Sequence, residues 1–145
     1  MKKIRENIFG ISIIVALITS VTIAAANQAI VVSGIKLPVR QGEVIGASNK
    51  EKLYYTNQYY ENIGTVSGFL GKYESIIAKP VATSGDCYGL NSKNEWITIG
   101  DKDKKGWDGA KTCTAFPGKY SIYLKRAVFN AFTTASHTGD WYYNL

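Results

Sequence analysis

The single histidine of the chain, His137, lies beside Ser136 and close to Asp140. These are the side-chain types from which a hydrolase assembles a nucleophile, a base and an orienting acid. The surrounding segment is rich in Thr and aromatic residues, which predicts a β-strand. Because adjacent strand residues point to opposite faces of a sheet, we do not expect Ser136 to approach His137. The sequence therefore predicts no catalytic residue, although a pair of carboxylates of the glycosidase kind stays open.

Asp101 and Asp103 match the first and third positions of a calcium-binding loop. The fifth position, Lys105, would place a cation among the ligands, and the twelfth, Thr112, lacks the bidentate carboxylate. The two cysteines and one histidine are too few for a zinc site without carboxylates. We expect no metal and no cofactor, with a looser calcium site that includes Asp108 as the alternative.

The only two cysteines are Cys87 and Cys113. An even pair in an exported chain predicts one disulfide bond. The alternative is that both thiols are free, which would hold if the host keeps its exported proteins reduced.

Three aromatic residues are the candidate binding residues. Trp107 lies in the charged stretch KKGWDG and is the tryptophan expected to be exposed, beside Lys104 and Lys105. Tyr55 and Tyr59 come from the tyrosine-rich stretch KLYYTNQYY. Rings of this kind stack on sugars or meet partners. Trp96, inside the apolar stretch EWITI, is expected in the core.

Residues 1–26 have the pattern of a secretory signal peptide. Lys2, Lys3 and Arg5 precede an uncharged run that ends in three alanines, so cleavage is expected before Asn27. Residues 27–145 then form one secreted domain that has no membrane span. The alternative is a leader that stays uncleaved and anchors the protein in the membrane.

The balance of charge favours anionic surfaces in a general way. The chain has 17 basic and 11 acidic side chains, and the part after residue 26 keeps a net charge of +4. This excess suits a bacterial envelope or an anionic glycan. It is too small and too scattered to predict nucleic-acid binding, and the sequence does not indicate the oligomeric state.

The chain after the leader reads as seven to nine short strands separated by Gly, Pro and Asn/Asp turns. We therefore predict an all-β fold, a single antiparallel β-sandwich of about eight short strands after the N-terminal signal peptide. The tail, 119–145, supplies two strands that close the sandwich. Proline cannot donate a ladder hydrogen bond, so Pro38 predicts an edge strand or a strand end, and Pro80 predicts an edge position or a bulge. The expected core comprises Ile77, Val81, Trp96, Ile97 or Ile99, Tyr120, Ile122, Leu124, Phe129 and Phe132.

The stretch KYSIYLKRAVFNAFTTASHTGDW carries a resemblance to a group of known proteins. It is similar to the ends of small uncharacterised secreted β-domain proteins of Gram-positive bacteria, which finish in a Tyr-containing strand, an Asn/Thr-rich strand and a Ser-Gly-x-Trp ending. Here Thr138 replaces that serine, and the cysteine pair is a further departure. The ending WYYNL resembles the aromatic end of lactococcin-type bacteriocins. The resemblance implies export and brings no catalytic residues.

These observations favour a secreted, non-enzymatic β-domain that acts at a bacterial cell surface or on other cells, in the manner of a bacteriocin. A carbohydrate- or cell-wall-binding module is the first alternative, and a small secreted hydrolase is the second.

Overall fold

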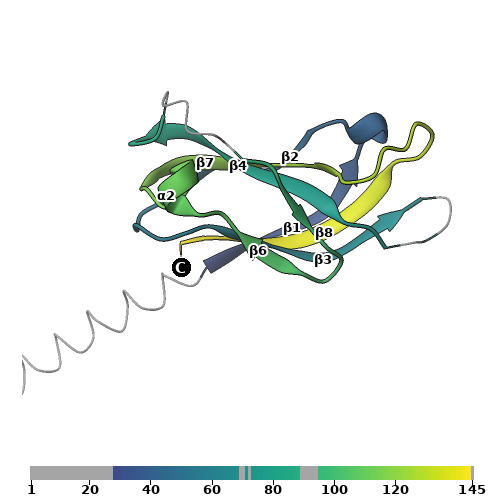
Figure 1. The fold of residues 1–145 in the computed structure, drawn as a ribbon, viewed down its shortest axis with the longest axis horizontal. Helices are drawn as coiled ribbons and strands as arrows, with labels where there is room; N and C mark the ends of the chain where they lie inside the picture. The colour runs from purple at the N-terminus through teal and green to yellow at the C-terminus, as the bar shows by residue number, and fades with distance from the viewer. Residues whose placement is uncertain (1–27, 69–70, 72, 89–94, 145) are drawn as a thin grey trace, which may run out of the picture.

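The computed structural model describes residues 28–68, 71, 73–88 and 95–144. They form eight strands in two four-stranded antiparallel sheets that pack as a sandwich (Figure 1). The all-β sandwich expected from the sequence is therefore confirmed. The expected leader, 1–26, lies outside the described residues. Within the described part of the chain, no helix is long and apolar enough to cross a membrane.

The first sheet has the strand order β1-β8-β3-β6 and the second has the order β2-β7-β4-β5. A 3-10 turn, η1, and a one-turn helix, α2, complete the described elements. Their bounds are β1 Gln28–Leu37, η1 Val39–Gln41, β2 Val44–Lys52, β3 Tyr59–Ser67, β4 Ile76–Gly85, β5 Ile97–Ile99, β6 Lys104–Gly106, α2 Gly109–Thr112, β7 Gly118–Arg126 and β8 Ala135–Asn144.

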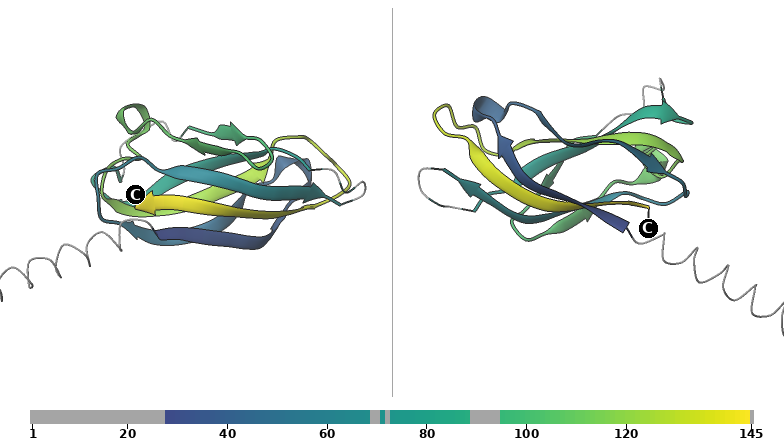
Figure 2. Two further views of the ribbon diagram at one scale, coloured as in Figure 1. Left: turned by 90° about the horizontal axis from the view of Figure 1, so that it is seen from below. Right: turned by 180° about the vertical axis from the view of Figure 1, so that it is seen from behind.

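The two strands of the tail lie in different sheets. β7 pairs with β2 and β4, whereas β8 pairs with β1 and β3. Each is therefore an interior strand with a neighbour on both sides. They belong to opposite layers of the sandwich and do not form a hairpin (Figure 2).

Pro38 and Pro80 lie where a missing backbone donor is tolerated. β1 is an edge strand of its sheet and ends at Leu37, directly before Pro38. Pro80 lies in β4 opposite Ile122 of β7, beyond the three residues of β4 that pair with β5. The position of Pro80 therefore has no described partner strand on its second side, where a backbone donor would otherwise be needed.

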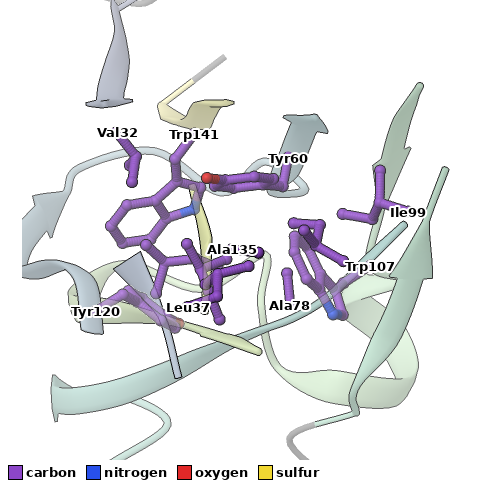
Figure 3. Packing of buried hydrophobic residues seen from close by; sticks show 12 residues of the cluster. Val32, Leu37, Tyr60, Ala78, Ile99, Trp107, Tyr120, Ala135 and Trp141 are labelled. Carbon is purple, nitrogen blue, oxygen red and sulfur yellow. The ribbon is translucent and has the colours of Figure 1, made fainter. Parts of the chain in front are cut away.

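The core confirms part of the predicted set. Ile99 of β5 and three inward residues of β7 are buried together with Trp141 and Tyr60 (Figure 3). The three residues of β7 are those expected, namely Tyr120, Ile122 and Leu124.

In β4 the inward face is the opposite of the expected one. Ile76, Ala78 and Pro80 are buried, while Ile77 and Val81 are only partly covered. The strand carries apolar side chains on both faces, so its alternation alone does not show which face turns inward.

Two of the expected core residues are exposed and one candidate binding residue is buried. Phe129 and Phe132 lie in the loop after β7 and are 62% and 91% exposed. Trp96 is only partly buried. Trp107, expected at the surface, is 2% exposed and belongs to the core cluster (Figure 3).

Several connections between the strands are short and irregular. The stretch from Tyr54 to Gln58 connects β2 to β3, and residues 112–116 form the end of α2 and the turn after it. Because β3 and β4 belong to different sheets, the chain crosses between the two layers after β3. Among the described residues of this crossing, a single bridge joins Val66 to Tyr73.

Candidate functional site

His137 is buried in the core, and Ser136 points to solvent on the other face of β8. The expected separation of these two side chains is confirmed. Gly139 and Trp141 share the inward face with His137, as the two-residue period of a strand requires. The candidate triad is therefore not assembled.

The imidazole of His137 takes part in a chain of buried hydrogen bonds. The Tyr60 hydroxyl lies 2.8 Å from Nε2, and Thr65 Oγ1 lies 2.7 Å from Nδ1. Thr65 donates to Asn62 Oδ1, and Asn62 Nδ2 donates to the carbonyl of Glu74. Because the Thr65 proton is directed to Asn62, Nδ1–H donates to Thr65 and Nε2 accepts from Tyr60.

This network holds the imidazole neutral. Burial lowers the pKa of His137 to about 4, against the smaller opposing effect of the Gly64 backbone. Burial also raises the pKa of Tyr60, so its hydroxyl stays protonated. The arrangement fixes β3 to β8 from within the core, and its lone pairs and protons are used by protein partners.

Two further buried polar side chains, Gln58 and Lys52, also have hydrogen-bond partners within the protein. Gln58 accepts from the Trp141 indole at 3.0 Å and donates to the carbonyl of Thr114. The Lys52 ammonium donates to the carbonyl of Tyr143 at 2.6 Å, and burial lowers the pKa of Lys52 to about 8. These contacts give the groups structural roles.

The two cysteines are free thiols, so the predicted disulfide is wrong for this structure. Cys113 is the C-cap of α2 with a left-handed φ of 59°. Cys87 lies in the turn after β4, and its thiol donates to the Cys113 carbonyl at 3.3 Å. Burial, and after it the neighbouring Cys113 side chain, raises the pKa of Cys87 to about 12, so that thiol is protonated at neutral pH.

Asp103 and Asp108 of the candidate calcium loop have separate local partners. Asp108 caps the N-terminus of α2 and lies 3.6 Å from the Lys111 ammonium. Asp103 accepts from the Lys104 amide and lies 3.8 Å from the Lys105 ammonium. Among the described residues, no group of three potential ligands is close enough to hold a metal ion.

One carboxylate pair does meet across two strands. Glu61 of β3 lies opposite Asp140 of β8 on the outer face of the first sheet. Glu61 accepts from the Tyr142 hydroxyl at 3.0 Å and has Lys104 as its neighbour on β6. The Lys104 ammonium in turn lies 3.6 Å from the centroid of the Tyr142 ring. A cation and an aromatic ring thus flank this pair on the sheet face.

The three candidate binding residues do not form one platform. Trp107 is buried, and its indole donates to the carbonyl of Glu95 at 2.9 Å. Tyr55 is exposed in the connection before β3 and packs edge-on against Phe116. Tyr59 is half-buried at the start of β3.

Another aromatic residue, Trp96, lies in a surface cluster that the sequence did not indicate. It precedes β5, and the ammonium groups of Lys79 and Lys125 lie 4.4 Å and 4.2 Å from its ring centroid. In the register of the sheet, Lys79 of β4 is opposite Tyr123 of β7, and Tyr123 is opposite the exposed Ile45 of β2. We call Ile45, Lys79, Trp96, Tyr123 and Lys125 the Trp96 face.

The Trp96 face follows from the alternation of β4 and β7. Because the residues on either side of Lys79 point inward, Lys79 must point outward, and the same holds for Lys125 on β7. Lys125 also lies 3.9 Å from Glu43, with 22% of its side chain exposed. The face therefore combines an indole ring with two cations, only one of which has a carboxylate partner among the described residues.

The described residues define a two-sheet β-sandwich whose histidine is structural and whose aromatic and cationic side chains gather on an outer face. Comparisons with protein-family models, with curated proteins and with solved structures found no match for the chain.

Proposed function

We propose that this protein is a secreted, non-enzymatic binding domain that acts at a bacterial cell surface, and that it binds anionic envelope polymers through the Trp96 face. The observation that carries the proposal is the position of the indole under two lysine ammonium groups on the outer side of a sheet. The polar groups of the interior support it, because they are already engaged with one another.

The chemistry of the face selects the class of ligand. Sugar rings present C–H groups that pack against an indole, and carboxylate or phosphate groups pair with ammonium ions. A glycan polymer that carries such groups offers both contacts at once. Tyr123 and Ile45 extend the apolar strip across the sheet, which suits an extended chain.

Retention on purified bacterial cell walls tests this proposal. Replacing Trp96 by Ala should weaken retention about tenfold, because a cation–ring or stacking contact is worth about 1–2 kcal/mol. The double variant Lys79→Gln with Lys125→Gln should be retained much more weakly than the wild type. The retention that is left should depend little on salt concentration. Walls stripped of their anionic polymers should retain the wild-type protein poorly.

The matched controls are an exposed tyrosine and an exposed lysine pair elsewhere. Tyr88→Ala, and Lys111→Gln with Lys119→Gln, should bind as the wild type does. The proposal fails if walls do not retain the wild type, or if Trp96→Ala binds unchanged. Trp107→Ala is not a binding test, because it removes a core side chain.

A further inference from the structure

The loop between β7 and β8, residues 127–134, presents three large apolar side chains to solvent. Val128, Phe129 and Phe132 are 57%, 62% and 91% exposed. The loop projects beyond the strands at the end of the sandwich opposite Gln28 and Asn144 (Figures 1 and 2). We call residues 127–134 the apolar tip.

The backbone of the apolar tip is held in place by its neighbours. Asn130 Oδ1 accepts from the amides of Phe132 and Thr133 at 2.8 Å and 3.1 Å. The Asn130 carbonyl accepts from the amide of Arg40 at 2.7 Å, and Gln41 Nε2 donates to the first carbonyl of the loop. The tip is therefore tied directly to the turn that follows β1.

A buried ion pair supports the tip from below. Arg126 donates to both oxygens of Glu74, at 2.8 Å and 2.9 Å, and its Nη1 donates to the carbonyl of Thr133. Its side chain is only 1% exposed. The fold thus holds two phenylalanines outward on a rigid support, which lowers the entropic cost of inserting them into an apolar medium.

The charge around the tip is positive. Lys36, which lies opposite Ser136 just after the tip, and Arg40, whose amide donates to the tip, are exposed and form no ion pair with any described residue. The carboxylates of the adjoining segments, Glu43 and Glu74, each already have a basic partner. Two cations without a described carboxylate partner therefore lie beside the apolar tip.

We propose that the apolar tip docks on the surface of an anionic lipid bilayer, with Phe129 and Phe132 in the interfacial region and Arg40 and Lys36 at the lipid phosphates. Apolar side chains beside basic ones suit such a surface. A projecting loop is buried more easily by a deformable lipid layer than by a flat protein face. A second copy is disfavoured, because it would bring the cations of two tips together.

This surface goes beyond the proposed function, since it uses different residues from the Trp96 face. Both described ends of the chain, Gln28 and Asn144, lie away from the docked tip. The domain would thus approach a bilayer with these ends pointing away from it.

Flotation with lipid vesicles tests the proposal on the protein in the form that its host produces. Vesicles that contain phosphatidylglycerol should carry the wild type, and pure phosphatidylcholine vesicles should carry much less. The double variant Phe129→Ser with Phe132→Ser should bind the anionic vesicles at least about tenfold more weakly, because two buried rings are lost. Lys36→Gln with Arg40→Gln should weaken binding and reduce its salt dependence.

The matched control removes two other large, exposed side chains, at the opposite end of the sandwich. Leu53→Ser with Tyr55→Ser, at 57% and 64% exposure, should bind as the wild type does. In the variant Phe132→Trp, brominated lipids should quench the tryptophan fluorescence more strongly than they do in the wild type. Equal binding by the tip variant, an unquenched reporter, or a dimer that the tip variant abolishes would each overturn the proposal. Wall retention by the Trp96 face is a separate readout, so the two surfaces can fail independently.

Discussion

At the scale of residues, the same side chain can serve catalysis or packing, and its partners decide which. His137 between a tyrosine and a threonine hydroxyl has both nitrogens engaged in the core. The Asn62 side chain orients the threonine and so sets which nitrogen carries the proton. A buried polar chain of this kind is stable only while every member is satisfied.

The low pKa of His137 makes folding stability depend on pH. The group titrates at about 4 in the folded protein and near 6.5 when exposed, so the unfolded chain binds the extra proton between these values. Its contribution is therefore complete above pH 6.5 and is lost as the pH falls towards 4. The expected loss is about 3 kcal/mol in the free energy of unfolding.

Urea unfolding of wild type and His137→Gln at several pH values measures this effect. The variant should be less stable at neutral pH by about 1–3 kcal/mol, because Tyr60 and Thr65 lose good partners. Between pH 6.5 and 4 its stability should fall less than that of the wild type. Parallel curves for the two proteins would contradict the assignment.

At the scale of elements, the contact between β3 and β8 depends on a residue without a side chain. A Cβ at Gly139 would lie 2.5 Å from the carbonyl oxygen of Glu61 and 2.6 Å from the Tyr60 hydroxyl. Glycine therefore allows the close approach on which the hydrogen bond from Tyr60 to His137 rests. The constraint is packing, because no positive φ occurs at Gly139.

Gly139→Ala should lower the free energy of unfolding by about 1–3 kcal/mol, because the backbone of β3 has to move to accommodate the methyl group. Gly64→Ala is the matched control on the paired strand. Its nearest atom beyond the chain neighbours would be 3.8 Å away, in the Tyr73 ring. Thermal melting compares the two, and equal melting temperatures would show that the strands accommodate the extra methyl group.

At the scale of the whole molecule, β8 pairs with the edge strand β1 on one side and supplies core residues on its inward face. It lies between β1 and β3 and places His137, Gly139 and Trp141 between the sheets. Removing it would leave β1 without its partner strand and would open the interior to water. The last strand of the chain is thus part of the fold rather than an appendage.

A chain truncated after Ser136 should therefore fail to fold. Far-UV circular dichroism and amide dispersion in NMR spectra should report a disordered chain, with the full-length protein as the reference. A soluble truncated product that melts cooperatively would contradict the role assigned to β8.

Local patterns in the sequence were enough for the class of fold and for several directions of side chains. The two-residue period of a strand is enough to place Tyr120, Ile122 and Leu124 on one face. It is also enough to place Ser136 and His137 on opposite faces. Pro38 marks the end of an edge strand, and Pro80 lies at a position of β4 that has a described partner strand on one side only. These rules need no knowledge of distant partners.

Tertiary structure alone decided which face of an ambiguous strand turns inward and which aromatic residues remain outside. β4 carries apolar residues on both faces, so its neighbours selected Ile76 and Ala78 for the core. Trp107 lies in a charged stretch, yet its indole reaches the carbonyl of Glu95, an acceptor in a different segment of the chain. Trp96 and Phe132 were expected inside and lie at the surface, because burial depends on which elements cover a residue and not on its own hydrophobicity.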